Sequence, residues 1–215
     1  MLRGKKLSIL GDSISTYPGI SNDASANATL RYHPCHYRSS FPLEQTYWMR
    51  IAKRFGLTLC VNNSWSGGNL SGRDDPDAGV NRAEHLSRDD GEAPDLIIVF
   101  MGINDLGRGV PLSVFAADYE RTLATVKTNH PHAEVCCVNL PDRYPDMKAR
   151  TEQFNNAICN AALKSGEQFF VADLFGSPLK NDVYYNNTVD GLHPDPDGMR
   201  MIAEVIEAAI MKKHA

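Results

Sequence analysis

The sequence predicts an α/β protein in which one parallel sheet lies between two layers of helices. Five short apolar runs recur along the 215 residues, and segments with helical spacing of apolar residues separate them. Most of the runs are continuously apolar, as in strands that are buried on both faces of a parallel sheet. Because strand and helix alternate throughout, we expect an open three-layer sandwich of about five strands, formed by a single domain over residues 1–215.

The apolar runs are the expected strands, and each is short enough for a buried strand of ordinary length. The strands are expected at Leu7–Leu10, Leu57–Val61, Leu96–Met101, Val135–Asn139 and Phe169–Ala172.

The expected helices fill the segments between the strands. One covers Leu43–Phe55, and a second begins at Ser113. A third covers Met147–Leu163, and the last runs from about Asp197 to Met211. Ser113 and Asp197 are the predicted N-caps, because their side chains can accept hydrogen bonds from the first free N–H groups of a helix.

Two stretches do not fit the alternation. Residues 17–42 are polar and aromatic without a clear period, and residues 71–94 are rich in Asp, Arg and Gly. We expect both to be long loops, or loops with a short helix. Long loops in a domain of this size are often functional.

The overall composition limits which classes of binding partner and which cellular location are expected for the protein. The net charge is −4 and the isoelectric point is about 6.0, which favours neither nucleic acid nor an anionic membrane as a partner. The longest apolar stretch, Leu96–Ile103, is too short to cross a bilayer. The basic N-terminus runs straight into an expected strand, so no removable signal is predicted. With an odd set of five cysteines and no C-x-x-C pair, a cytoplasmic location is expected.

No metal or organic cofactor is predicted. His33, Cys35 and His36 resemble half of a zinc site, but no second Cys/His pair has suitable spacing, so a loop is the preferred interpretation. The acidic residues within 74–77 lack the ligand order and the closing Glu of a calcium loop.

Chemically distinctive residues follow the expected strands. Ligands of open parallel sheets bind just beyond the carboxyl ends of the strands, so these residues should meet at one edge. The segments are GDSIS at 11–15, NNSWSGG at 62–68, GIND at 102–105 and DGLHP at 190–194.

Together these segments contain the parts needed for acyl transfer. A serine such as Ser13 is a weak nucleophile that needs a base to take its proton, and His193 has an ordinary pKa of about 6.5 for that role. Asp190, three residues earlier, can hold the other ring nitrogen. An amide at Asn104 and the backbone N–H groups of Gly67 and Ser13 would stabilise the negative oxygen of the intermediate.

The four segments, in this order and spacing, resemble the SGNH (GDSL-type) hydrolase superfamily. The resemblance implies a flavodoxin-like sandwich and an esterase, lipase, thioesterase or carbohydrate-deacetylase activity without a cofactor. It assigns Ser13, His193 and Asp190 to a catalytic triad, and Ser13, Gly67 and Asn104 to an oxyanion hole. The first block reads GDSIS where many members have GDSL, a difference that affects packing rather than chemistry.

Each of these residues also has a structural interpretation. Ser13 could cap a helix, His193 could be a residue at a helix entrance, and Asn104 and Gly67 could belong to turns. The joint presence of all four segments favours the catalytic interpretation. Asp12 and Asp105 are expected to hold loops through Asx-turn hydrogen bonds rather than to act as catalysts.

The function predicted from these residues is hydrolysis of a small ester, such as an acetylated carbohydrate. An acyltransferase with the same triad is an alternative that the sequence does not separate. A non-enzymatic flavodoxin-like binding module is a second alternative, but GDSIST at 11–16 lacks the G-x-G-x-x-G pattern of a phosphate loop. The oligomeric state is left open.

Overall fold

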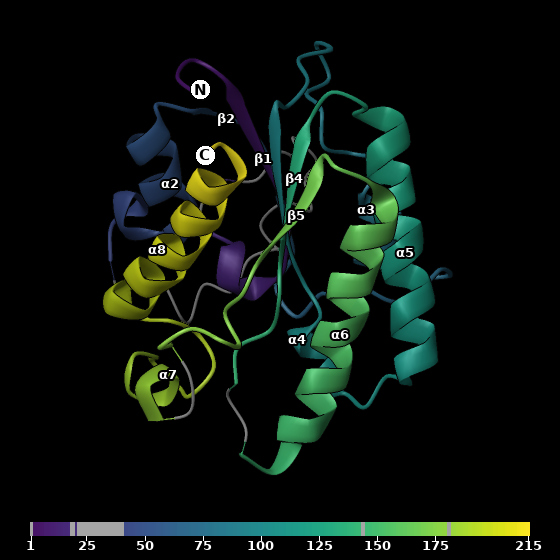
Figure 1. Cartoon of the computed structure of the whole chain (residues 1–215), viewed down its shortest axis with the longest axis vertical. Coiled ribbons are helices and arrows are strands. Elements are labelled where there is room, and N and C mark those ends of the chain that lie inside the picture. Colours follow the sequence, from purple (N-terminus) through teal and green to yellow (C-terminus); the bar gives the residue numbers. More distant parts are fainter. Residues whose placement is uncertain (1, 18–19, 21–40, 143–144, 180–181) are drawn as a thin grey trace.

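The computed structural model describes residues 2–17, 20, 41–142, 145–179 and 182–215, and it confirms the α/β fold (Figure 1). Within these ranges the strands form one parallel sheet with the order β2-β1-β3-β4-β5, the order of flavodoxin-like folds. The strands are β1 (Lys6–Gly11), β2 (Thr58–Ser64), β3 (Leu96–Phe100), β4 (Glu134–Val138) and β5 (Phe169–Ala172).

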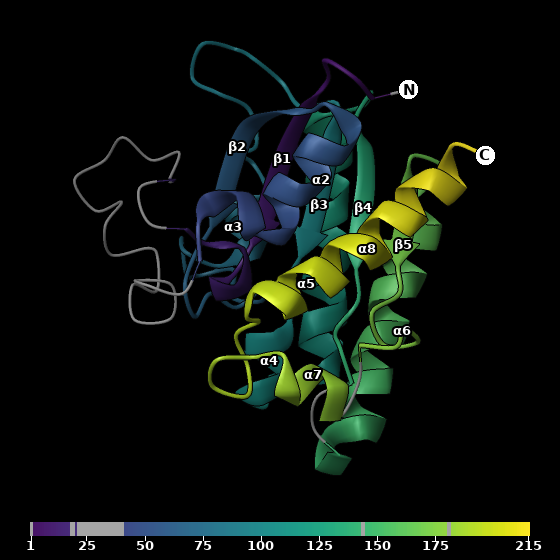
Figure 2. The same ribbon diagram turned by 90° about the vertical axis from the view of Figure 1, so that its left-hand side faces the viewer.

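Helices cover both faces of the sheet, which makes the three layers. Helices α2 (Tyr47–Phe55) and α8 (Pro196–Lys213) lie on one face (Figure 1). On the other face lie α3 (Gly79–Arg82), α5 (Leu112–Asn129) and α6 (Lys148–Ser165), and the second view shows α2 and α8 crossing the near side (Figure 2).

The core explains why these segments take these forms. All five residues of β3 are buried, as expected for the central strand of a sheet that is covered on both sides. On α5 the residues at helical spacing, Phe115, Tyr119 and Leu123, are fully buried. The ring of Phe115 stacks on that of Phe154 from α6 at a centroid distance of 4.4 Å. Burial of such side chains contributes about 1.5–3 kcal/mol each and makes the sheet a rigid support for its edge.

Each of the two predicted N-caps, Ser113 and Asp197, is wrong by two residues. Helix α8 begins at Pro196, and Asp195 caps it by accepting hydrogen bonds from the N–H groups of residues 197 and 198. Proline is favoured at a first helical position because it has no N–H to leave unpaired. Helix α5 begins at Leu112 after Pro111, whose carbonyl accepts the first helical hydrogen bonds.

Several further boundaries differ from the expectation, and two of them move by three or four residues. The segment 43–55 contains a 3-10 turn, Leu43–Gln45, before α2, because Thr46 is extended and caps α2 through the N–H of Met49. Strand β2 continues to Ser64, since its backbone stays paired with β1 up to Gly11. Asn62 and its neighbours therefore belong to the strand and not to the loop behind it.

The expected loops have different outcomes. Residues 71–94 are loops with the short helix α3, as predicted. Most of the stretch 17–42 lies outside the described residues. Two short helices, α4 (Ile103–Gly107) and α7 (Asp182–Asn186), lie at the carboxyl end of the sheet (Figure 1). Neither was predicted, because five residues are too few for a helical period to be visible.

Within the described part of the chain, no helix combines the length and the apolar character needed to cross a membrane. The same part contains no group of three or more His, Cys, Asp or Glu side chains arranged to hold a metal ion. His33, Cys35 and His36, for which a loop was preferred over half of a zinc site, lie outside the described residues.

Candidate active site

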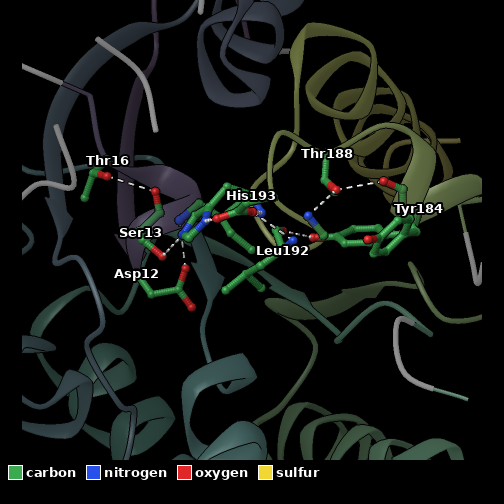
Figure 3. Close-up of polar contacts among 11 residues, drawn as sticks. Asp12, Ser13, Thr16, Tyr184, Thr188, Leu192 and His193 are labelled. Atoms are coloured by element: carbon green, nitrogen blue, oxygen red, sulfur yellow. Dashed lines mark hydrogen bonds and ion pairs between the residues drawn. The ribbon is translucent and has the colours of Figure 1, made fainter. Parts of the chain in front are cut away.

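Ser13 lies on a tight turn at the carboxyl end of β1. The strand ends at Gly11, and residues 13–15 form a 3-10 turn, which Asp12 caps by accepting the N–H of Ile14 at 3.0 Å. This is the Asx-turn role predicted for Asp12. Thr16 closes the turn, because its hydroxyl donates to the carbonyl of Ser13 at 2.8 Å (Figure 3). The local hydrogen bonds therefore hold the Ser13 side chain at the edge of the sheet.

His193 connects this turn with the other end of the chain. Its Nε2 lies 2.8 Å from the Oγ of Ser13, although 180 positions separate the two residues in sequence (Figure 3). Its Nδ1 lies 2.8 Å from Oδ2 of Asp190. Both Ser13 and His193 are buried, with exposed fractions of 3% and 5%. The hydroxyl, the imidazole and the carboxylate thus form one continuous hydrogen-bonded row.

Asp190 remains ionised in this position. Partial burial by itself raises the pKa of its carboxyl, but hydrogen bonds from His193 and from the N–H of Leu192 outweigh that effect and lower the pKa to about 2. One oxygen accepts the two backbone N–H groups and the other faces the ring. The carboxylate therefore fixes the orientation of the imidazole and favours a proton on Nδ1.

The loop that carries His193 is itself held by side chains of its own segment. The buried Tyr184 of α7 donates its hydroxyl proton to the carbonyl of Leu192 at 2.8 Å (Figure 3). The hydroxyl of Thr188 accepts the N–H of Gly191 at 2.8 Å. These contacts fix the backbone of the two residues before His193. They therefore also restrict the position from which the His193 side chain extends.

The segment around Gly67 lies beside the turn of Ser13. The N–H of Trp65 donates to the carbonyl of Gly11 at 3.2 Å, which attaches this segment to the end of β1. Gly67 has φ of +70°, a left-handed conformation that glycine adopts without strain. On α4, the amide of Asn104 donates to the carbonyl of Gly68 at 3.0 Å. Asn104 is therefore anchored next to Gly67.

Asp105 holds the same segment from α4. Its two carboxylate oxygens accept the N–H groups of Leu70 at 2.7 Å and Ser71 at 2.9 Å. The expected hydrogen-bonding role is thus present, but it is not an Asx turn, because the bonded amides lie more than thirty positions away.

Arg82 is a buried residue of the site region that the sequence analysis missed. Its guanidinium donates to the carbonyls of Gly11 and Asn63 at the ends of β1 and β2, and its Nε donates to the carbonyl of Asp77. It also lies over the ring of Trp65, 5.5 Å from the centroid. No local pattern indicates this role, since Arg82 lies in a polar segment that reads as a solvated loop.

Two buried carboxyl groups lie beneath the site. Burial raises the pKa of Asp12 to about 7, although the N–H of Ile14 and the charge of Arg82 act in the opposite direction. Burial also raises the pKa of Asp105, and the hydrogen bonds from residues 70 and 71 reduce that rise. Asp12 is therefore a carboxyl that changes its charge near neutral pH.

Comparison with known proteins places this arrangement in a family. The model of the GDSL-like lipase/acylhydrolase family matches residues 9–201. No protein of curated function matches the sequence. A protein from Bacteroides ovatus, assigned to the GDSL-like lipases, is 24% identical with a TM-score of 0.74, and the match covers 97% of this chain and 99% of that one.

Two further solved structures are similar in fold. A protein from Lactobacillus plantarum is 21% identical with a TM-score of 0.73, and both chains are covered completely. A family two carbohydrate esterase from Clostridium thermocellum, in complex with cellohexaose, is 18% identical with a TM-score of 0.70; the match covers 98% of this chain and 64% of that one. At these identities the structural likeness establishes the fold. The sequence match extends over most of the chain, and the protein therefore belongs to the GDSL-like lipase/acylhydrolase family.

Proposed function

We propose that the protein is a serine hydrolase that cleaves a small ester with Ser13, His193 and Asp190 as its catalytic triad. The observation that carries the proposal is the row of two 2.8 Å contacts, from Ser13 Oγ to His193 Nε2 and from Nδ1 to Asp190. A base within hydrogen-bond reach of the nucleophile, itself oriented by a third group, is the arrangement that activates a serine.

In the proposed reaction, Oγ of Ser13 attacks the ester carbonyl carbon while its proton moves to Nε2 of His193. The carboxylate of Asp190 stabilises the imidazolium that forms. The tetrahedral intermediate then expels the alcohol, which takes the proton from Nε2, and the acyl group stays on Ser13. Water, deprotonated by His193, attacks the acyl-serine and releases the acid and the free enzyme.

The proposed oxyanion hole consists of the backbone N–H groups of Ser13 and Gly67 and the amide of Asn104. One amide hydrogen of Asn104 is used by the carbonyl of Gly68, so the second is the donor proposed for the hole. Each preorganised donor of this kind typically raises kcat by a factor of about 10²–10³.

For the substrate we propose a small polar ester, such as an acetylated carbohydrate. The family two carbohydrate esterase from Clostridium thermocellum was solved with cellohexaose, and its fold is shared by this chain. Three polar side chains lie next to the proposed hole, Asn69, Asn104 of α4 and Arg108 at the end of α4. We further propose that residues 1–215 act as one domain, and that it is cytoplasmic, in line with the free thiols of Cys60, Cys136 and Cys137.

The test is hydrolysis of 4-nitrophenyl acetate and of acetylated sugars by the wild type and by Ser13→Ala. We expect the variant to lose at least about 10³-fold in kcat/KM while it keeps the wild-type circular dichroism spectrum. A fluorophosphonate probe should modify the wild type at residue 13 and leave the variant unmodified. Ser113→Ala, which changes an exposed serine on α5, is the matched control. Turnover by Ser13→Ala at the wild-type rate would contradict the proposal.

A further inference from the structure

Helix α4 and Arg108, the residue that caps its end, bind the glycine segment of Gly67, Gly68 and Asn69 through two side chains, and the second of them carries a charge. Asn104 and Arg108 lie four positions apart, so they share one face of the helical turn. Asn104 binds the carbonyl of Gly68. Nη1 of Arg108 donates to the carbonyl of Gly67 and to Oδ1 of Asn69, both at 2.6 Å. The guanidinium is therefore held in place beside the proposed oxyanion hole.

The second terminal nitrogen of this guanidinium, Nη2, also lies close to Gly67. A Cβ atom on Gly67 would lie 3.2 Å from Nη2 of Arg108. The two contacts of Nη1 use both of its hydrogens, so the N–H groups of Nη2 and Nε remain as donors. The residue is exposed to solvent. Three donors on a fixed, positively charged group thus adjoin the residue whose N–H we assign to the hole.

The charge of Arg108 is not neutralised by the described part of the protein. Within the described residues, Arg73 and Arg200 lie within 4.0 Å of a carboxylate, whereas Arg108 makes no such pair. The exposed Arg121 makes none among these residues either, but of the two only Arg108 is held beside Gly67 by two hydrogen bonds to neutral oxygens. The nearby Asp105 uses both of its oxygens on backbone N–H groups. An oriented arginine that is bound only to neutral oxygens can still accept a carboxylate in a two-pronged contact.

We propose that Arg108 forms an anion subsite, and that the preferred esters carry a carboxylate a few atoms from the scissile carbonyl. This inference rests on the proposed hydrolase function, because Arg108 is placed relative to Gly67 of the proposed hole. The carboxylate can belong to the acyl part or to the alcohol part of the ester. In either case it would contact Nη2 and Nε of Arg108 while the carbonyl oxygen occupies the hole.

The experiment compares a charged and a neutral ester within each enzyme variant. For the acyl part, the pair is 4-nitrophenyl hemisuccinate and its methyl ester; for the alcohol part, it is 4-acetoxybenzoate and its methyl ester. The quantity measured is the ratio of kcat/KM for the charged ester to that for the neutral one. Division of the wild-type ratio by the variant ratio removes the intrinsic reactivities of the esters.

We expect Arg108→Gln to lower this ratio about fivefold to tenfold for at least one pair, and Arg108→Lys to retain part of the preference. The wild-type preference should also decrease as salt is added. Arg121→Gln, which removes an exposed charge from α5, is the matched control and should leave the ratio unchanged.

A loss by Arg108→Gln that is equal for charged and neutral esters in both pairs would overturn the inference, since it would mean that Arg108 only holds the glycine segment. That result leaves the proposed hydrolase intact as long as Ser13→Ala remains inactive. If Ser13→Ala hydrolyses these esters as fast as the wild type, the proposed function itself fails.

Discussion

At the scale of single residues, Asp12 combines two properties that oppose each other. Its side chain caps the turn of Ser13, which requires an oxygen acceptor, and it is buried, with an exposed fraction of 2%. A carboxylate satisfies the first requirement but loses hydration through the second. The outcome is a carboxyl whose pKa is raised to about 7, directly next to the proposed nucleophile.

This shift predicts a specific pH dependence of stability. Between pH 3.8 and about 7, the folded protein keeps a proton on Asp12 that the unfolded chain has lost. The free energy of unfolding therefore falls as the pH rises through this window, by on the order of 4 kcal/mol from this group. Asp12→Asn keeps an oxygen for the N–H of Ile14 but cannot ionise, so its unfolding free energy should lack this decline.

The measurement is urea unfolding of wild type and Asp12→Asn at a series of pH values from 4 to 8. The difference between the two curves isolates the contribution of Asp12, because all other groups are common to both. Asp74→Asn, at an exposed loop position, is the control and should run parallel to the wild type. Parallel curves for wild type and Asp12→Asn would show that the pKa of Asp12 is close to its unfolded value.

At the scale of elements, the short helix α7 supports the loop that carries the proposed catalytic base His193. Its Tyr184 is buried and binds the carbonyl of Leu192, the residue before His193. The N–H of Val189 also donates to the carbonyl of His193 at 2.8 Å. The imidazole is therefore positioned by the backbone of its own loop, and α7 holds that backbone. Tyr184 is a positioning residue in this interpretation.

We predict that Tyr184→Phe lowers kcat about tenfold with little change in KM, because it removes the hydroxyl that fixes the loop while leaving substrate contacts in place. The lost hydrogen bond should also cost about 1 kcal/mol of stability. Kinetics well below the unfolding temperature separate the two effects. Tyr185→Phe, at a residue whose side chain is 62% exposed, is the matched control. A variant that is less stable but has the wild-type kcat would limit Tyr184 to a structural role.

At the scale of the whole molecule, the parallel sheet brings distant segments to one edge. The segments that follow β1 and β3 and the one that precedes α8 carry the proposed nucleophile Ser13, the proposed oxyanion donor Asn104 and the proposed base His193. They meet because neighbouring parallel strands such as β1 and β3 end on the same side of the sheet. The proposed chemistry then needs no group beyond these side chains and backbone N–H donors.

We therefore predict that hydrolysis of 4-nitrophenyl acetate is unchanged after incubation with EDTA and dialysis. In the proposed reaction the imidazole of His193 activates the nucleophile and the N–H donors stabilise the oxyanion, so no proposed step requires a metal ion. The assay compares initial rates before treatment, after treatment and after addition of Zn²⁺. Inhibition by EDTA that Zn²⁺ reverses would renew interest in the metal interpretation of His33 and His36.

Much of the fold was predictable from local pattern. The strands were found because continuous apolar runs such as residues 96–100 can be buried on both faces only inside a covered sheet. The long helices were found because Phe115, Tyr119 and Leu123 repeat at helical spacing. The short helices α4 and α7 were missed, since one turn contains no period. The start of α8 was misplaced because Asp195 and Asp197 are both suitable caps, and Pro196 decides between them.

The candidate residues of the site were also predictable, but their environment was not. Residue types and order indicated Ser13, His193 and Asp190, whose catalytic roles stay predictions to be tested. The contacts of Arg82 with two strand ends, of Tyr184 with the His193 loop and of Arg108 with Gly67 had no local signal. Each joins parts of the chain through space, where spacing along the sequence carries no information.

The sequence by itself determined which segments become strands and long helices, and which reactive side chains follow them, because burial periodicity and residue chemistry are local properties. Only the tertiary structure decided that an alcohol and an imidazole 180 positions apart meet at 2.8 Å, that Asp12 loses its hydration, and that a guanidinium lies beside Gly67. Distances and desolvation arise from the packing of the whole chain, and they set both the reactivity and the selectivity proposed for this protein.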